Sequence, residues 1–294
     1  MPSTPLVSVV IPTYNRGPFL AEAIESVLGQ SFTEYEILVA DDGSTDDTAD
    51  RLARYGARTR HIRLDHSGRP SVARNRALAV ARGELIAFLD DDDVWQPEKL
   101  ERQVHLLVAQ PDLGMVYTDL RFLREDGTRS APILQPHQKR RGNLFDDLLA
   151  DCFIHPSTTM VRKCLGDEVG WFDEDLEIIE DFDLWLRLAY RSQIGLLNEP
   201  LVLVRRHDAG ISTTREVEIW RNMGVVLDKV STDCKLSVRQ RLRLRQSRAR
   251  AHARLATLVT GGGRVDRREL MRALRFNPLL PSAWSALLGS YLGP

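Results

Sequence analysis

The 294-residue sequence predicts an α/β protein with a mostly parallel sheet flanked by helices, followed by a helical C-terminal region. Between residues 6 and 89, short apolar runs alternate with segments of helical period in the order β-α-β-α-β-α-β. This order favours parallel strands joined by right-handed crossovers. After residue 110 the alternation gives way to strands of mixed pairing, and from about residue 215 the pattern is helical throughout.

Four short runs define the first strands, and the first of them is an apolar β-branched run stopped by Pro12, which is typical of a strand buried on both faces. They are LVSVVI from Leu6, YEILVA from Tyr35, HIRLD from His61 and ELIAFL from Glu84. Helical segments separate these strands. Residues 17–30 have a helical period, with Gly29 near the end. Ser44 or Thr45 is the expected cap of the next helix. Residues 70–83 open with proline and end with glycine, as helices often do.

The second half of the sequence predicts strands over residues 114–123, 157–163, 194–198 and 200–207. Residues 180–192 form one strong amphipathic helix, whose apolar face consists of Phe182, Trp185, Leu186 and Ala189. Trp185 is therefore expected in the core rather than in a sugar-binding platform. Residues 1–215 are expected to form the sheet domain and residues 216–294 a helical C-terminal region.

The C-terminal region is basic, although the formal net charge of the whole chain is only -1. Residues 235–275 hold thirteen basic and two acidic residues, so the rest of the chain is acidic. A balance near zero argues against a nucleic-acid binder. The basic helices are either a solvated face or a peripheral contact with anionic lipid, worth on the order of 1 kcal/mol per basic residue.

Residues 270–288 contain two predicted short helices joined by an Asn-Pro turn, and the 19-residue end of the chain carries no charge. Its apolar stripe, Trp284, Leu287, Leu288 and Tyr291, is expected to pack on the domain or on a second copy, which leaves a homodimer open. The helix pair resembles a single tetratricopeptide-type hairpin, whereas a solenoid needs several.

Three cysteines without a CxxC pair argue against a disulfide framework or a zinc site and fit a reducing cytoplasm. The N-terminus has the pattern of a first strand rather than of a signal peptide. No run reaches the roughly 18 apolar residues of a membrane span. We therefore expect a cytoplasmic protein, with peripheral attachment to the inner face of the membrane as an addition.

Acidic and polar residues follow three of the predicted strands: Pro12-Thr13-Tyr14-Asn15, Asp41-Asp42 and Asp90 to Asp93. Ligands of open α/β sheets bind beyond these carboxyl ends. Like charges about 4 Å apart cost around 4 kcal/mol at an effective dielectric near 20, and no lysine or arginine cluster is adjacent in sequence. A hard cation, Mg²⁺ or Mn²⁺, would offset this repulsion and would also bind a diphosphate. The alternative is that Asp91 and Asp93 cap a helix starting near Gln96.

Four ordered segments identify a resemblance: SVVIPTYNR, VADDGSTDDT, ARNRALAVARGELIAFLDDDD and EDFDLWLRLA. Together they resemble the motifs of family-two inverting glycosyltransferases with the GT-A fold, over roughly residues 6–210. The resemblance implies a nucleotide-sugar donor, with UDP favoured, and a saccharide or lipid-linked acceptor. It does not cover the C-terminal region.

The resemblance also implies donor-binding roles. Pro12 and Tyr14 would border the nucleobase, and Asp42 would bind its edge with support from Asp41. Asp90 and Asp92 resemble the DxD signature, with Asp92 on the metal ion and Asp90 or Asp91 on the ribose. The arginines that would contact the nucleotide are Arg69 and Arg74, although Arg74 would equally serve to brace the carboxylates.

The catalytic base follows from the same resemblance. An inverting transfer needs a base that removes the proton of the acceptor hydroxyl during attack. The motif match assigns this role to Asp181, with Glu180 positioning acceptor or base. Acids also suit the first turn of any helix because of its dipole, and Asp183 is assigned such a structural role.

Further candidates lie in two segments. In residues 201–212, His207 would ligate the metal or donate to a phosphate, and Arg205 would pair with phosphate oxygens. In residues 153–163, His155 and Ser157 are expected on the acceptor side. Competing functions are a nucleotidyltransferase, which would want a glycine-rich basic loop after the first strand, and a non-catalytic nucleotide-sugar binding protein.

Overall fold

The computed structural model describes residues 4–135, 140–206, 215–259 and 265–292. Contacts divide the chain into two compact units. The first comprises Met1–Leu144, Phe153–Asp175 and Arg187–His207, and the second comprises Phe145–Cys152, Leu176–Leu186 and Asp208–Pro294. Helix α7 (Glu180–Arg191) belongs to both, since its first seven residues fall in the second unit and its last five in the first.

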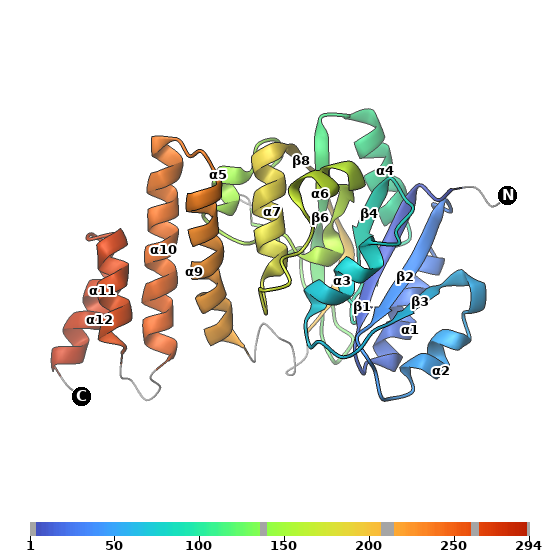
Figure 1. The fold of residues 1–294 in the computed structure, drawn as a ribbon, viewed down its shortest axis with the longest axis horizontal. Coiled ribbons are helices and arrows are strands. Elements are labelled where there is room, and N and C mark those ends of the chain that lie inside the picture. The colour runs from blue at the N-terminus through green and yellow to red at the C-terminus, as the bar shows by residue number, and fades with distance from the viewer. Residues whose placement is uncertain (1–3, 136–139, 207–214, 260–264, 293–294) are drawn as a thin grey trace. The chain divides into compact units, whose positions relative to one another are not determined.

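The first unit is built on a sheet of eight strands among the described residues, in the order β3-β2-β1-β4-β7-β6-β8-β5 (Figure 1). The strands are β1 (Val7–Thr13), β2 (Tyr35–Asp41), β3 (Arg60–Arg63), β4 (Leu85–Phe88), β5 (Val94–Trp95), β6 (Leu113–Leu123), β7 (Met160–Arg162) and β8 (Gln193–Arg205). Strands β1 to β4 pair in parallel. Strand β7 is antiparallel to β4 and β6, β8 is parallel to β6, and β5 is antiparallel to β8. The predicted α/β class with a parallel first half is confirmed.

Helices cover both faces of this sheet. They are α1 (Gly17–Leu28), α2 (Thr48–Ala53), α3 (Pro70–Leu78), α4 (Lys99–Ala109) and α6 (Lys163–Val169). The odd-numbered residues of β1 share one buried cluster with the apolar stripes of α1 and α4. Strand β1 is buried along its whole length, as its unbroken apolar run predicts.

Three local expectations are wrong. Neither Ser44 nor Thr45 caps α2, because Asp47 occupies that position and the backbone amides of both residues donate to side chains at the strand ends. The two strands predicted over 194–207 form the single strand β8, because irregularities in its pairing with β6 absorb the Asn-Glu-Pro interruption. The helix expected near Gln96 begins at Lys99, because Val94 and Trp95 pair with β8 first.

The second unit is helical. It contains α5 (Phe145–Leu148), the start of α7, α9 (Glu216–Asp233), α10 (Val238–Leu258), α11 (Arg267–Phe276) and α12 (Pro281–Leu292). Helices α9 and α10 run antiparallel side by side (Figure 1). A capping box at Ser237 starts α10. The predicted Asn-Pro turn joins α11 to α12, whose buried sides meet α10 in a small apolar cluster. Among the described residues, no helix is both long and apolar enough to cross a membrane.

Candidate functional site

The ends of strands β1, β2 and β4 meet in the first unit. The Thr13 hydroxyl donates to Asp91 Oδ2 at 2.7 Å, which joins the end of β1 to the turn after β4. The Asp42 amide donates to the Thr13 carbonyl at 2.9 Å, which joins β2 to β1. The polar residues that follow these strands are therefore neighbours, as the parallel topology predicts.

Arginines from distant parts of the chain pair with three of the four acids of this turn, namely Asp90, Asp91 and Asp92. Arg16 Nη1 lies 2.5 Å from Asp92 Oδ2 and 3.2 Å from Asp91 Oδ1. Arg74 Nη2 lies 2.6 Å from Asp90 Oδ1, so Arg74 does brace a carboxylate, one of its two expected roles. The sequence argument missed Arg16, because it looked for bases adjacent to the acids. The available signal was its position directly after the PTYN segment at the end of β1.

The acids differ in protonation. Burial would raise the pKa of Asp90, but the charges of Arg74 and His155 bring it below its usual value. Burial, opposed by Arg16, raises the pKa of Asp91 to about 7. Burial and the neighbouring charges of Asp92 and Asp90 raise the pKa of Asp93 well above its usual value. The turn therefore holds both ionised and protonated carboxyl groups near neutral pH.

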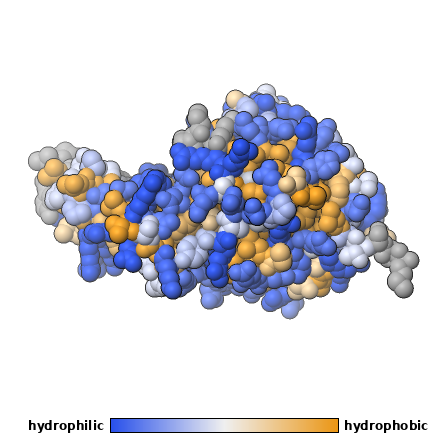
Figure 2. Space-filling view, turned by 90° about the horizontal axis from the view of Figure 1, so that it is seen from above, coloured by the Kyte–Doolittle hydropathy of each residue, from blue (hydrophilic) through white to orange (hydrophobic). Residues whose placement is uncertain are grey.

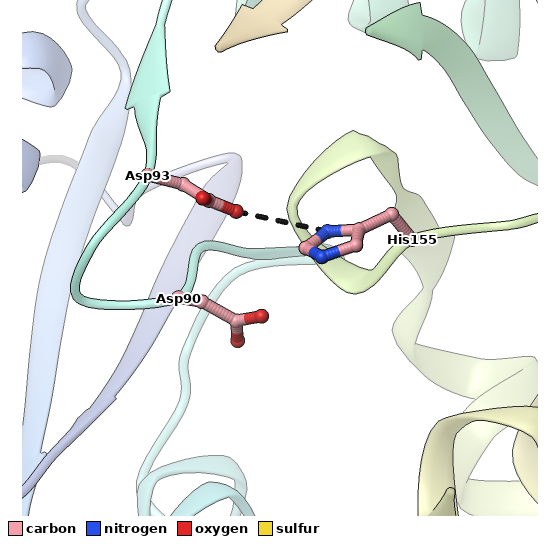
Figure 3. Close-up of side chains that lie close together, drawn as sticks. All are labelled: Asp90, Asp93 and His155. Carbon is pink, nitrogen blue, oxygen red and sulfur yellow. Dashed lines mark ion pairs between the residues drawn. The ribbon is translucent and has the colours of Figure 1, made fainter. Parts of the chain in front are cut away.

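Asp93, for which the sequence leaves open a place in the acidic metal platform or a helix cap, forms a cluster with Asp90 and His155 (Figure 3). One ligand atom from each lies within 4.8 Å of the others. His155 Nδ1 is 3.6 Å from Asp93 Oδ2 and is a buried nitrogen without a hydrogen-bond partner among the described residues. Ser157 Oγ donates to Asp93 Oδ2 at 2.5 Å and accepts from the Asp90 amide at 3.0 Å. His155 and Ser157, expected on the acceptor side, thus lie beside the carboxylates.

A buried network supports the segment that carries Ser157. The Trp95 indole donates to the Ser157 carbonyl at 2.9 Å, and the Gln103 amide donates to the Thr158 carbonyl at 2.8 Å. Lys99 Nζ donates to Gln103 Oε1 at 2.6 Å and lies 3.9 Å from the centroid of the Trp95 ring. Burial lowers the pKa of Lys99 well below its usual value.

On the other side of the turn, Tyr14 stacks on His66, with ring centroids 4.0 Å apart. His66 Nδ1 lies 3.0 Å from Asp42 Oδ2. The Asp42 carboxylate also accepts from the Ser67 amide, the Ser67 hydroxyl and the Gly68 amide, each at 2.8 Å. Tyr14 and Asp42, both expected at the nucleobase, therefore lie together against one loop.

The remaining expected donor residues are also engaged within the first unit. Asp41 is fully buried and accepts from the Ser44 amide at 2.8 Å, so it holds the turn as expected. Pro12 is buried within β1. Arg69 Nη1 donates to the Glu174 carbonyl at 2.6 Å.

Arg205 joins the acidic turn to α1. Its amide donates to Asp93 Oδ1 at 3.1 Å, its Nε donates to the Asp92 carbonyl at 3.2 Å, and its Nη2 pairs with Glu22. His207 lies outside the described residues.

Glu180 and Asp181 belong to the second unit, where they begin α7. The preceding residue, Ile179, has a φ of 57°, a left-handed conformation that is unusual for a β-branched residue. Asp181 is half-buried, and its Oδ1 accepts from the Phe182 amide at 2.7 Å. Burial and the nearby charge of Asp181 raise the pKa of the Cys152 thiol, which keeps the thiol protonated.

Helix α9 holds both sides of this acidic helix start. Lys229 Nζ lies 2.7 Å from Asp183 Oδ1, and Asp183 is buried. Arg215, immediately before α9, lies 2.9 Å from Glu177. The C-terminal region therefore supplies two cations to the segment that contains Asp181. Trp185, one turn further along α7, is fully buried, as expected of a core residue.

The fold and the strand-end site define a glycosyltransferase of the GT-A type. The family described as Glycosyl transferase family 2 matches residues 8–163, more than half of the chain. The chain belongs to this family.

Curated relatives and solved structures agree with this family assignment. TuaG of Bacillus subtilis, a glycosyltransferase named for teichuronic acid biosynthesis, is 31% identical over 216 residues, covering 72% of this chain and 83% of TuaG. In other curated relatives the matched region spans as little as 21% of the relative. S. aureus TarS 1–349 has a TM-score of 0.71 at 20% identity, covering 97% of this chain and 87% of TarS. The mannosyltransferase PcManGT from Pyrobaculum calidifontis, solved with GDP-Man and Mn²⁺, has a TM-score of 0.62 at 20% identity, covering 99% and 81%. The likeness to these two structures concerns the fold.

Proposed function

We propose that this protein is an inverting, metal-dependent glycosyltransferase that moves a sugar from a nucleotide-sugar donor, with UDP favoured, to a hydroxyl of a saccharide or lipid-linked glycan. The observation that supports it most is the gathering of four carboxylates at the end of β4, beside the ends of β1 and β2. TarS has been solved with UDP-GlcNAc and PcManGT with GDP-Man and Mn²⁺, and TuaG is named for teichuronic acid biosynthesis.

The donor would be held by the residues already assigned to it. Its nucleobase would stack on Tyr14 beside Pro12, with Asp42 at the base edge. Because Asp42 accepts three hydrogen bonds from residues 67–68, this carboxylate is fixed before any ligand arrives. Arg69 and Arg74 stabilise the surrounding loop and the Asp90 carboxylate, and so position the site.

The acidic turn fits a hard divalent cation. Asp90 and Asp92, with His207, are the assigned ligands, and the structure adds Asp93 and the unsatisfied buried nitrogen of His155. Carboxylate oxygens and a single imidazole suit Mg²⁺ or Mn²⁺. When bound, such an ion would offset the negative charge that grows on the departing diphosphate. Arg16, which neutralises Asp91 and Asp92, would act on the same charge.

Asp181 would accept the proton of the acceptor hydroxyl. Its half-exposed carboxylate accepts one hydrogen bond from the Phe182 amide, at the positive end of α7. Glu180, which is buried next to it, would help to orient the acceptor or the base. The hydroxyl would lose its proton as its oxygen attacks the anomeric carbon and the bond to the nucleoside diphosphate breaks.

A thermal-shift screen of UDP-, dTDP- and GDP-sugars with Mn²⁺ or Mg²⁺ tests the donor proposal. We expect one nucleotide class to raise the melting temperature, and to do so more with metal than with EDTA. Asp92→Ala should lose the metal-dependent part of the shift. Asp112→Ala, at an acid outside the site, should keep it. Equal donor affinity with Mn²⁺ and with EDTA in calorimetry would rule out the metal role of Asp92.

A further inference from the structure

The basic residues of the C-terminal region divide into two groups. Those of α10 mostly bind neighbouring groups within the second unit. Arg243 and Arg250 donate to the carbonyls of Asp146 and Ala150, both at 2.8 Å. Arg254 lies 2.6 Å from Glu216, and Arg248 pairs with Asp228. These arginines join α10 to α5 and α9, so they serve the fold.

The basic residues of α11 are different, because they lie on its exposed side. This side consists of Arg267, Arg268, Met271, Arg272 and Arg275, at the i, i+1, i+4, i+5 and i+8 spacing of one helix face. The opposite side, with Leu270, Ala273 and Leu274, is buried in the cluster shared with α10. Glu269, the acid within this helix, is also buried, and its Oε1 lies 2.5 Å from Arg272 Nη1.

The next helix adds exposed apolar side chains. Leu279 is 85% exposed, Leu288 is 58% exposed and Trp284 is 45% exposed. The Trp284 indole donates to the Pro278 carbonyl at 2.7 Å, which fixes the ring at the surface. Hydrophobic and hydrophilic side chains are mixed on the surface of α11 and α12 (Figure 2). We call the exposed residues of α11 together with Leu279, Trp284 and Leu288 the α11–α12 face.

We propose that the α11–α12 face binds an anionic lipid surface. Arginines attract lipid phosphates, while an aromatic ring and leucines suit the boundary between headgroups and acyl chains. A second copy of the chain fits less well. In a two-fold contact the same face meets itself, which would bring eight arginines together, with Glu269, already paired with Arg272, as the acid within each α11 to offset them. The proposal is independent of the sugar transfer.

Co-sedimentation with vesicles tests this. The full chain should pellet with phosphatidylcholine vesicles that contain phosphatidylglycerol, should pellet far less at 500 mM than at 50 mM NaCl, and should stay in solution with phosphatidylcholine alone. Arg268→Glu combined with Arg275→Glu should weaken binding about thirtyfold or more. Trp284→Ser combined with Leu288→Ser should weaken binding while keeping its salt dependence.

The matched control is Arg54→Glu with Arg58→Glu, the same charge change at exposed positions of the first unit, which should leave binding unchanged. Circular dichroism melting shows whether each variant is folded. No pelleting of the wild-type chain would overturn the proposal, as would equal loss in the control. A dimer interface on this face would also overturn it. In that case the wild type would dimerise in analytical ultracentrifugation, the α11–α12 variants would be monomeric, and neither the wild type nor the variants would bind vesicles.

Discussion

The ring of Tyr14 lies nearly parallel to the imidazole of His66, at an interplanar angle of 18°. One face of the Tyr14 ring, which is proposed to receive a nucleobase, is therefore already covered by His66. A base stacked on an aromatic ring contributes about 1–3 kcal/mol. Tyr14→Ala should accordingly weaken UDP binding about tenfold in calorimetry, whereas Tyr14→Phe should keep it.

Substitution of His66, the ring stacked on Tyr14, distinguishes two ways in which a nucleobase could bind to Tyr14. If the base takes the place of the imidazole, His66→Ala removes a competitor and UDP should bind more tightly. If the base uses the other face of Tyr14, His66→Ala should bind UDP no better. Unaltered UDP binding in Tyr14→Ala would contradict any stacking role for this ring.

Asp181→Asn should abolish transfer while leaving the donor bound. General bases contribute roughly 10²- to 10⁴-fold, so turnover should fall by at least a hundredfold with an unchanged donor Kd. Asp175→Asn, an exposed acid of the preceding loop, is the control and should retain turnover. A normal turnover number in Asp181→Asn would place the base elsewhere.

The pair between Lys229 and Asp183 should stabilise the fold. Asp183 is buried and Lys229 is partly exposed. The stabilisation by this pair should therefore lie between that of surface salt bridges and that of buried salt bridges. Lys229→Met should lower the free energy of unfolding by about 2 kcal/mol, measured by urea denaturation. Lys229→Arg should lower the free energy of unfolding much less, because the positive charge is kept. Adding Asp183→Asn to Lys229→Met should recover part of the loss, because no unpaired buried charge remains; failure to recover would exclude an ion-pair origin.

Lys99 predicts a pH dependence of stability. Its amine is fully buried, and burial lowers its pKa in the folded protein well below the usual lysine value of 10.5. Between these two pKa values the unfolded chain binds a proton that the folded protein does not. Unfolding therefore becomes less favourable as the pH rises toward 10, and the folded state gains stability. Denaturation at pH 7, 8.5 and 10 should show this rise in the wild type and a flatter profile in Lys99→Met.

The sequence predicts the parallel pairing of the first four strands and the meeting of the strand ends, because an alternating βα pattern leaves few arrangements. It misses how the acids are neutralised. Arg16 and Asp92 are 76 residues apart, and only folding shows that they touch. The same holds for Asp93 and His155, which come together because β7 pairs with β4 and brings the segment before it beside the turn. Periodicity describes neighbours along the chain, whereas these contacts depend on pairing between strands.

The division of α7 has a practical consequence for anyone who shortens this gene. A polypeptide ending near residue 215 would retain every side chain assigned to the nucleotide, yet Asp183 would lose Lys229. Such a fragment should still recognise its donor, but the first turn of α7, which presents Asp181, would be poorly anchored. Trimming the C-terminal helices to obtain a minimal enzyme would then leave a binding protein instead.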